Sequence, residues 1–458
     1  MEFIGRKKEL AQLNRYYESD KKEFGVIYGR RRIGKSSLIC EFLKDKDCIL
    51  FQAKRDNLYG NLKSFSFKLG EKLNLPAGFT FSSWEDAFLS VKQYAQGKRF
   101  VLAIDEYPYI LEQEPNFSSV VQEFIDNADD NMFLLLSGSD VSFLTKEIKD
   151  HNSPLYKRRT FEMQINKLDF DEAVQFLADF DNETKCKYLS IMSTYPYYLR
   201  AINHKISFEE NVKTLLFNQY GAFFSLPDQI LSNSTKVQDV YNAILIAIAH
   251  RKYSNKEIAD YIHEDEAKVA KYLITLQNSE IVMKYQTFMG TKKTIYYDFC
   301  DNLLKFWYKF IFNNAERIKI NGEIVFAEQK ENIDKFISFG FENVCRLYLD
   351  QKNKNGELNT VYEPLKPYKV EKSALGRSVE IDGLSQVEDS LLVVECKYRN
   401  TKFNMQMLLH LKESASVFPS KLKKYYYIFS KSGFEQNVLS QKSSQITLIT
   451  LKDMFPSQ

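Results

Sequence analysis

Eight residues near the start of the chain have the types and spacing of a phosphate-binding loop, or P-loop. Gly29-Arg30-Arg31-Arg32-Ile33-Gly34-Lys35-Ser36 follows the apolar run Phe24–Tyr28 and opens a helical pattern. Its glycines let backbone N–H groups curl around phosphate oxygens, and the helix start adds positive potential. We expect Lys35 to reach the β- and γ-phosphates of a nucleotide and Ser36 to ligate Mg²⁺. The residues expected to contact the nucleotide here are Gly29, Arg32, Ile33, Gly34, Lys35, Ser36 and Ser37.

Two acids end a second apolar run and supply the other half of this chemistry. Residues 100–104 run directly into Asp105-Glu106, which is typical of a buried parallel strand that ends at a nucleotide. We expect Asp105 to hold the Mg²⁺ shell and Glu106 to polarise the attacking water. The P-loop and this acid pair, in this order, indicate an ATP-hydrolysing site with ATP and Mg²⁺ as its cofactors.

Four further residues are candidates for the same site, each with a plainer alternative. Ser137 and Ser139 end the next predicted strand, where a serine can sense the γ-phosphate or orient the water; a simple serine turn is the alternative. Arg158 and Arg159 are candidates for an arginine finger that contacts a phosphate, or for a solvated basic turn. The three arginines inside the P-loop are expected to be solvated or to contact acids.

A second constellation lies near the C-terminus. Asp382 ends the strand pattern VEID, and Glu395-Cys396-Lys397 ends LLVVECK thirteen residues later. Residues two apart in a strand face the same side, so Glu395 and Lys397 project together, and a hairpin brings Asp382 beside them. Two carboxylates and a lysine can form a Mg²⁺ site for phosphodiester hydrolysis, with Lys397 orienting the water or neutralising the charged transition state. Glu342, on the preceding helix, is a candidate extra ligand.

Alternating strands and helices must position the first site. Strand patterns at 24–28, 48–52, 100–104, 132–136 and 161–165 are separated by longer, mostly helical stretches. Such alternation favours a parallel sheet covered by helices. In this kind of nucleotide-binding fold, the strand before Ser137 lies between the P-loop strand and the acid strand.

The middle of the chain reads as helical. Residues 169–230 predict a compact helical lid, and residues 231–312 predict three helices and a hairpin with a turn at Gly290, which favours a winged helix-turn-helix. In a DNA-reading role, the third helix would place Lys268, Lys271 and Gln277 in a major groove. A rigid spacer or a protein contact is the alternative role for this module. The polar segment 313–328 is expected to connect it to the next domain.

Together these motifs resemble the P-loop ATPases of the AAA+/STAND-like group found in archaea and bacteria. Members open with G-R-x-x-E-L, here Gly5–Leu10, and carry an arginine-rich P-loop, an Asp-Glu Walker B motif and a P-L-Y-x-R-R segment, here Pro154–Arg159. The resemblance covers roughly the first 300 residues and implies that Phe3–Arg6 lies by the adenine. Members often have Gly-Gly-x-Pro-x-Tyr-Leu in the lid; this chain has Ser193–Leu199, STYPYYL, without either glycine.

The C-terminal constellation resembles the PD-(D/E)xK, restriction-endonuclease-like core. The order helix, strands, helix, strand over residues 329–458 fits that core, and such a domain follows the ATPase in many members of the group above. The resemblance implies an α/β nuclease-like domain with Asp382, Glu395 and Lys397 as catalytic residues and the two acids as metal ligands. A degenerate nuclease fold used only for binding is the alternative.

Charge is distributed unevenly along the chain. The 458 residues carry a net charge of +3, which excludes a uniformly basic nucleic-acid coat. Residues 399–458, however, hold nine basic and three acidic residues, which favours a DNA partner over a merely solubilising surface. The basic residues are Arg399, Lys402, Lys412, Lys421, Lys423, Lys424, Lys431, Lys442 and Lys452.

Other compositional features narrow the setting. The six cysteines contain no C-x-x-C pair, so a disulfide framework or zinc ribbon is not expected and a reducing cytoplasm is the simplest location. The longest apolar run, 243–249, is far shorter than the roughly 20 residues that span a membrane, so no membrane partner is expected.

The sequence therefore predicts an α/β P-loop NTPase with a parallel sheet, a helical lid, a winged helix-turn-helix and a C-terminal α/β nuclease-like domain. The expected bounds are 1–168, 169–230, 231–312, 313–328 for the linker, and 329–458. The preferred function is ATP-regulated DNA binding or Mg²⁺-dependent cleavage. The alternative is a nucleotide-dependent signalling switch whose C-terminal domain only binds a partner. A homo-oligomer formed through the ATPase domain stays open.

Overall fold

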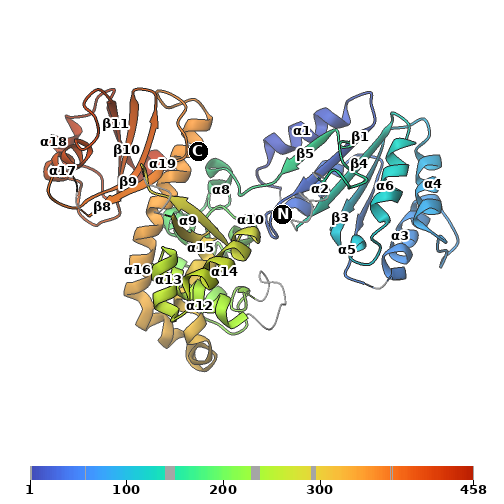
Figure 1. The fold of residues 1–458 in the computed structure, drawn as a ribbon, viewed down its shortest axis with the longest axis horizontal. Helices are drawn as coiled ribbons and strands as arrows, with labels where there is room; N and C mark the ends of the chain where they lie inside the picture. The colour runs from blue at the N-terminus through green and yellow to red at the C-terminus, as the bar shows by residue number, and fades with distance from the viewer. Residues whose placement is uncertain are drawn as a thin grey trace. The chain divides into compact units, whose positions relative to one another are not determined.

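The chain folds into two compact units, residues 1–168 and 169–458, which are described separately (Figure 1). The structure, a computed structural model, describes residues 3–56, 58–139, 150–227, 238–289, 295–371, 373 and 375–456.

A five-stranded parallel sheet in the order β2-β3-β4-β1-β5 forms the centre of the first unit. The strands are β1 Glu23–Tyr28, β2 Cys48–Gln52, β3 Phe100–Asp105, β4 Met132–Gly138 and β5 Phe161–Gln164. Every residue of β1, β3 and β4 is buried, as expected for parallel strands covered on both faces. The predicted parallel sheet is confirmed, and β4 lies between the P-loop strand and the acid strand.

Helices cover both faces of this sheet. They are α1 Lys7–Tyr17, α2 Lys35–Leu43, α3 Leu58–Leu73, α4 Trp84–Ala95, α5 Pro108–Leu111 and α6 Phe117–Asp126. Aromatic rings fill the space between helices and strands: Phe42 of α2 packs on Phe133 of β4, and Phe65 of α3 packs on Phe51 of β2 and on Trp84. This aromatic core holds the carboxyl edge of the sheet in place.

The second unit begins with helices and a small hairpin. Its first elements are α8 Phe170–Gln175, α9 Asn182–Met192, α10 Pro196–Leu199, α11 Phe208–Leu216, α12 Gln238–Ala249, α13 Asn255–Ile262, α14 Glu266–Asn278, β6 Val282–Gln286, β7 Ile295–Phe299 and α15 Asn302–Phe310. Strands β6 and β7 pair antiparallel, and Gly290, expected at their turn, lies outside the described residues. Three helices followed by this hairpin are the elements that the winged-helix prediction requires; the assignment itself stays a prediction.

A long helix, α16 Ala315–Lys354, runs from there to the C-terminal sheet. The polar segment 313–328, predicted as a linker, lies in the short 3₁₀ helix η2 Phe312–Asn314 and the first part of α16, which is kinked at Asn321. Helix α16 packs against α9 and β10, so it is part of the core rather than a free connection.

A mixed five-stranded sheet in the order β12-β11-β10-β9-β8 completes the second unit. The remaining elements are β8 Lys366–Val370, β9 Val379–Val387, β10 Ser390–Lys397, α17 Met405–Ala415, β11 Lys423–Ser430, α18 Gln436–Leu439, β12 Ile446–Thr450 and α19 Leu451–Met454. Strands β8, β9 and β10 pair antiparallel, whereas β10, β11 and β12 pair parallel. The ring of Phe455 stacks on that of Phe170, so the end of the chain packs on the helical part of the same unit.

Candidate functional site

The P-loop joins β1 to α2 at the carboxyl edge of the first sheet. Gly29 has a φ of 157°, and a Cβ there would lie 2.3 Å from the carbonyl oxygen of Ile165, so only glycine fits. Lys35, the first residue of α2, is buried to 5% exposure, and its Nζ donates to the carbonyl oxygens of Gly29 at 2.7 Å and Arg30 at 3.2 Å. The loop thus holds the ammonium group where a bound nucleotide would place its phosphates.

Five predicted residues meet beside this loop. Ser36 Oγ donates to Asp105 Oδ2 at 2.6 Å, and the other oxygen of Asp105 accepts from Ser137 Oγ and from the backbone N–H of Glu106. Ser139 donates to Glu106 Oε2 through its N–H at 3.2 Å and its Oγ at 2.9 Å. Hydroxyl and carboxylate oxygens are the ligands that Mg²⁺ prefers, so Ser36 and Asp105 fit this ion.

The backbone of Glu106 is held in a conformation that is uncommon for this residue type. Its φ is +54°, a left-handed value that costs on the order of 1 kcal/mol outside glycine. The neighbouring N–H of Tyr107 donates to the carbonyl oxygen of Ser137 at 2.9 Å, and Ser139 fixes the Glu106 carboxylate. The chain therefore directs this carboxylate toward the edge of the sheet where β4 and the P-loop lie.

Two further arginines, Arg31 and Arg6, contact this site, and the partners of Arg31 are hydroxyl groups rather than acids. Arg31 Nη2 donates to the Tyr109 hydroxyl at 2.6 Å, and its Nε lies 3.4 Å from Ser139 Oγ. Arg6, only 3% exposed, donates to the carbonyl oxygen of Ile33 in the P-loop at 2.8 Å and to that of Asn166 at 2.6 Å. Arg6 thereby holds the P-loop against the first segment of the chain. The resemblance to AAA+/STAND-like ATPases implies that this segment lies by the adenine.

Arg158 and Arg159 are not brought to this edge. They precede β5, whose Phe161 pairs with Gly25 near the start of β1, about 13 Å of strand away from the P-loop. Arg158 instead pairs with Asp126 at 2.9 Å, and Arg159 pairs with Glu162 at 2.7 Å. Within one chain, these arginines lie at the opposite edge of the sheet from the nucleotide site.

The C-terminal residues converge at one end of the second sheet. The register of β9 and β10 pairs Gly383 with Val394, so one step further along the ladder Asp382 lies beside Glu395. Asp382 Oδ2 accepts from the backbone N–H of Cys396 at 2.7 Å. Lys397 Nζ forms an ion pair with Glu395 Oε1, and the two side chains are 25% and 14% exposed. The three residues therefore form one half-buried cluster.

Helix α16 contributes a third carboxylate and an arginine to this cluster. Arg346 donates to the carbonyl oxygen of Asp382 at 3.0 Å and lies 3.5 Å from the Glu342 carboxylate. Burial, together with the charge of Asp382, raises the pKa of Glu342 to about 7. In the same way, burial and Asp382 raise the pKa of Glu395 to about 7. Burial also raises the pKa of Asp382, although the Lys397 ammonium opposes this.

The main cause of these raised pKa values is burial, and the charge of Asp382 adds to it for Glu342 and Glu395. Such a group takes up a proton or a cation to relieve the repulsion. Within the described parts of the chain, no three His, Cys, Asp or Glu side chains are close enough together to hold a metal ion between them. A divalent ion here would therefore be held by two carboxylates, Asp382 and Glu395, and by water or substrate oxygens.

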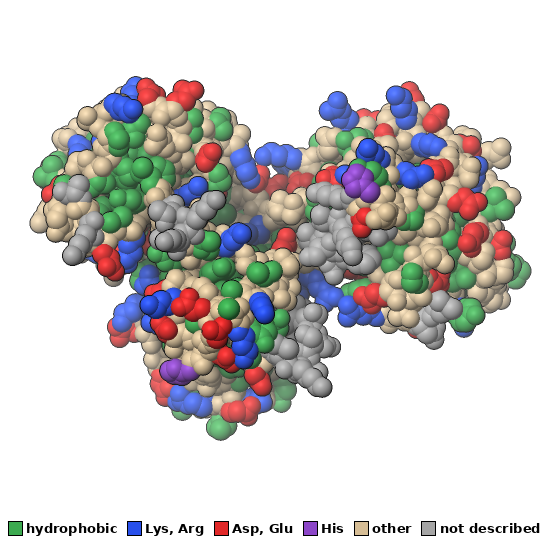
Figure 2. Space-filling model, in the orientation of Figure 1, with side chains coloured by type: hydrophobic (Ala, Val, Ile, Leu, Met, Phe, Trp, Pro, Cys, Tyr) green, Lys and Arg blue, Asp and Glu red, His purple; other side chains and the backbone are tan. Residues whose placement is uncertain are grey.

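The basic residues of the C-terminal region lie at different places on the sheet. Lys423 pairs with Ser390 at the start of β10, five residues and about 17 Å from Glu395. Lys431 forms an ion pair with Glu183 at 3.0 Å. Arg399 and Lys402 are exposed and directly follow Lys397. On the face shown in Figure 2, basic and acidic side chains are interspersed over both units.

Two of the three candidate DNA-reading side chains on the third helix of the predicted winged helix contact neighbouring residues. Lys268 pairs with Glu264 at 2.8 Å, and the side chain of Gln277 donates to the carbonyl oxygen of Leu273 at 2.9 Å. Lys271 is exposed. The helix begins with Asp265 and Glu266, so its first turn is acidic. Because reading helices usually approach bases through their first turn, this charge disfavours DNA at that end.

Comparisons with known proteins agree with the geometry of the first site. Residues 3–190 match a family described as an ATPase domain predominantly from Archaea. Residues 3–190 form a P-loop ATPase domain. The match runs past the first unit into α9, so the ATPase family includes part of the helical lid. Residues 307–409 match a family described as archaeal and bacterial proteins of unknown function.

Two curated proteins of Methanocaldococcus jannaschii are similar to this chain. One, described as uncharacterized, is 27% identical over 465 aligned positions that cover 98% of this chain and 99% of that protein. The other, described as an uncharacterized ATP-binding protein, is 46% identical over 44 residues, 10% of this chain and 75% of that protein. Among solved structures, the ORC2 protein of Aeropyrum pernix in ADPNP and ADP complexes shares 13% identity at a TM-score of 0.45, covering 72% of this chain and 97% of that chain.

None of the helices that the structure describes is long and apolar enough to cross a membrane.

Proposed function

We propose that this protein uses ATP hydrolysis in its first unit to control DNA binding by its second unit, and that Asp382, Glu395 and Lys397 cleave the bound DNA with Mg²⁺. The observation that supports the cleavage proposal is the cluster itself: two half-buried carboxylates side by side at a strand end, with a lysine on the same strand face as Glu395. The pKa values of Glu342 and Glu395, which burial and the charge of Asp382 raise to about 7, support this proposal because perturbed carboxyl pKa values cluster at functional sites.

In the ATPase unit, Lys35 would contact the β- and γ-phosphates, and Ser36 and Asp105 would hold Mg²⁺, which neutralises charge on the phosphates when bound. Glu106 would orient the attacking water, and the Ser139 hydrogen bonds would fix its carboxylate during the reaction. Arg31 is close enough to Ser139 to respond to the γ-phosphate.

At the second cluster, Asp382 and Glu395 would hold Mg²⁺, which makes a bound water more acidic. Hydrolysis at this cluster would form a bond from a water oxygen to phosphorus and break the bond from phosphorus to the leaving oxygen, while the proton of the water would pass to a neighbouring base. Lys397 lies against Glu395 and would neutralise charge that builds on the phosphate oxygens.

Exposed basic side chains that follow Lys397 in the sequence support DNA contact. Arg399 and Lys402 follow Lys397 closely in the sequence and are exposed, so they are available to contact the phosphates of a bound strand. Replacing both with glutamate should weaken DNA binding alike for all sequences and reduce its dependence on salt. The more distant Lys421, Lys423 and Lys424, replaced together, should weaken affinity with less effect on cleavage of the DNA that stays bound. Undiminished binding by both variants, measured by fluorescence anisotropy over a range of salt, would remove these surfaces from the proposal.

Cleavage is tested by incubating the full chain with supercoiled plasmid, Mg²⁺ and ATP. We expect nicking by the wild type and none by Asp382→Ala, while ATP hydrolysis stays largely intact because the P-loop is in the other unit. Asp389→Ala is the matched control, since Asp389 is an exposed acid in the turn of the same hairpin. Equal nicking by Asp382→Ala and the control would assign the cleavage to another site or to a contaminant.

A second candidate function is a nucleotide-dependent signalling switch whose C-terminal domain binds a partner without cleaving it. Lys397 and Arg346 favour it, because both cations already lie against the carboxylates and can neutralise them without a metal. This alternative predicts no Mg²⁺-dependent nicking under any nucleotide, and nucleotide-dependent partner binding that Asp382→Ala leaves unchanged.

A further inference from the structure

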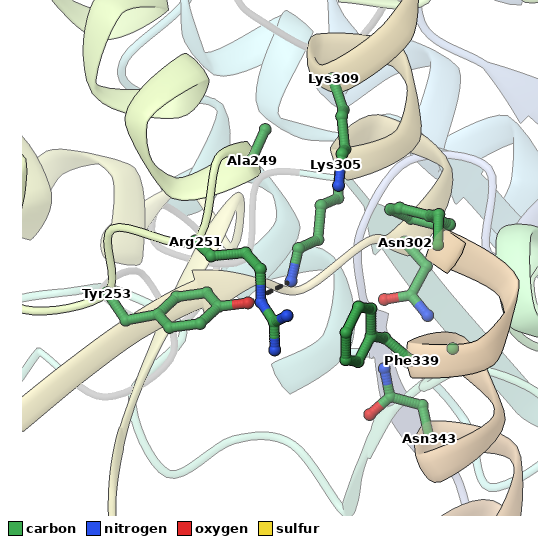
Figure 3. A pocket seen from close by; sticks show the side chains of 10 residues that line it. Ala249, Arg251, Tyr253, Asn302, Lys305, Lys309, Phe339 and Asn343 are labelled. Carbon is green, nitrogen blue, oxygen red and sulfur yellow. Dashed lines mark hydrogen bonds between the residues drawn. The ribbon is translucent and has the colours of Figure 1, made fainter. Parts of the chain in front are cut away.

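A basic pocket lies in the second unit, outside both clusters described above. It has a volume of about 50 Å³ and forms where the end of α12 meets α15 and α16 (Figure 3). A single water needs about 10–15 Å³ of such space, so the pocket has room for a small polyatomic group. The polar residues that line it are Arg251, Tyr253, Asn302, Lys305, Lys309 and Asn343.

Three cations face this space: Asp298 pairs with Lys305, and the charge of Glu342, which precedes Asn343 on α16, interacts with that of Arg251. Lys305 and Lys309 lie one helical turn apart on the same face of α15. Lys305 is paired: its Nζ lies 2.7 Å from Asp298 and 3.3 Å from the Tyr253 hydroxyl. No acidic side chain in the described ranges lies within ion-pair distance of Lys309 or Arg251. The pocket therefore carries an excess of positive charge.

Of the two lysines, Lys309 is the one whose protonated form is destabilised. Burial, together with the charges of Lys305 and Arg251, lowers the pKa of Lys309. By contrast, Asp298 and Tyr253 outweigh the effect of burial on Lys305 and raise its pKa. A bound anion would relieve the repulsion that Lys309 experiences, as Asp298 does for Lys305.

The position of Arg251 is unusual for an arginine. It follows the last turn of α12 with a φ of +67°, and its N–H donates to the carbonyl oxygen of Ile248 at 2.9 Å. Helix ends of this left-handed kind are usually glycine, because other residues are strained there. The guanidinium carbon lies 3.8 Å from the centroid of the Phe339 ring, a cation–π contact that holds this exposed side chain beside the pocket. A strained position that carries a fixed cation suggests that the side chain is used.

Asn343 on α16 adds a neutral donor. Arg346 donates to its side-chain oxygen at 3.2 Å, which leaves the amide nitrogen to face the pocket side of the helix. Arginine, lysine and an amide N–H₂ together supply the charge-assisted hydrogen bonds that tetrahedral oxyanions accept.

We propose that this pocket binds a single phosphate group through Arg251, Lys309 and Asn343. The phosphate belongs either to a free ion or nucleotide or to the end of a nucleic-acid strand, since these present the same oxyanion. The site is separate from the P-loop, which lies in the other unit, and the proposal does not depend on cleavage at Asp382 and Glu395.

The test uses the full chain carrying Lys35→Ala, so that the P-loop does not contribute phosphate binding. Inorganic phosphate is titrated by calorimetry into this protein and into versions with Arg251→Gly or Lys309→Gln added. Arg251→Gly suits the left-handed backbone, so it should fold at least as well while losing the guanidinium. His263→Gly is the matched control, because His263 is an exposed residue with a φ of +55° at the end of α13, away from the pocket.

We expect saturable phosphate binding that weakens about tenfold or more with Arg251→Gly and with Lys309→Gln, and that His263→Gly leaves unchanged. No saturable binding to the Lys35→Ala protein, or equal binding by all variants, would overturn the proposal. Oligonucleotides with and without a 5′-phosphate then distinguish the sources. Tighter binding of the phosphorylated strand that Arg251→Gly abolishes identifies a strand end; equal binding of the two strands, alongside phosphate binding, identifies a free ion or nucleotide.

Discussion

Replacing Glu395 with glutamine should stabilise the second unit at alkaline pH when no divalent metal is present. A carboxyl whose pKa is higher in the folded protein than in the unfolded chain binds its proton more tightly when folded. The stability that this proton provides is complete below a pH of about 4.5 and is lost as the pH rises to about 7. Glutamine resembles the protonated carboxyl, so it keeps that stability at high pH.

The size of the effect follows from the shift. A rise from 4.5 to about 7 corresponds to on the order of 3 kcal/mol for a side chain that is only 14% exposed. Because the charge of Asp382 is one cause of the raised pKa of Glu395, a neutral glutamine also removes the repulsion between these two side chains. The substitution also removes the ion pair between Glu395 and Lys397, which lowers stability. We therefore expect the free energy of unfolding to rise by about 1–3 kcal/mol at pH 8.

The measurement is denaturant unfolding at pH 5 and pH 8 in the presence of a chelator. The chain has two tryptophans, Trp84 in the first unit and Trp307 in the second, so a Trp84→Phe background makes fluorescence report the second unit alone. We expect Glu395→Gln to raise the free energy of unfolding at pH 8 and to change it little at pH 5. The matched control is Glu388→Gln, an exposed glutamate in the turn of the same hairpin.

Two results would refute this reasoning. If Glu395→Gln destabilises the unit at pH 8, the ion pair with Lys397 outweighs the cost of burying the charge. If wild type and variant show the same difference between pH 5 and pH 8, the carboxylates are not strained by one another. Adding Mg²⁺ extends the test: an ion that binds the folded protein at ten times its dissociation constant adds about 1.4 kcal/mol to the wild type, and much less to the variant.

Three further outcomes test the first unit and the lid. Glu106→Gln should keep ATP binding and lose most turnover, whereas Lys35→Ala should lose binding; equal hydrolysis by wild type and Glu106→Gln would remove Glu106 as the base. Because Arg158 lies far from the P-loop of its own chain, we propose that it acts on a neighbouring copy, so mixing inactive Arg158→Ala with inactive Lys35→Ala should restore part of the ATPase rate. Ser193→Gly should stabilise the lid by about 1 kcal/mol in thermal unfolding, because Ser193 has a φ of +53° in a region that favours glycine.

The sequence located the strands of the first unit well because each is an apolar run bounded by turn residues. The expected strand at 48–52 matches β2, and the others differ from β1, β3, β4 and β5 by no more than two residues at either end. Once those strands are parallel, their carboxyl ends meet at one edge, so the contact between Ser36 and Asp105 follows from topology.

Contacts between distant parts of the chain could not be read in the same way. Arg6 reaches the P-loop from 27 positions before Ile33, and no local pattern records that bond. The polar segment 313–328 was interpreted as a linker because it has little apolar character, yet it is mostly helical. Lys319 pairs with Glu316 one turn away, and Arg317 pairs with Glu328 across the kink at Asn321, so both ion pairs favour the observed geometry of this polar segment.

Helix α16 connects the lid to both C-terminal sites within the second unit. At Gly340 it approaches α9 so closely that a Cβ would lie 2.7 Å from the carbonyl oxygen of Ser190. Within one turn of that contact, Phe339 and Asn343 line the basic pocket and Glu342 joins the carboxylate cluster. Because a helix moves as a rigid element over so short a length, any shift of α9 against α16 must displace all three side chains together. Helix α9, most of which lies within the residues that match the ATPase family, therefore contacts the part of α16 that lines the basic pocket and reaches the carboxylate cluster.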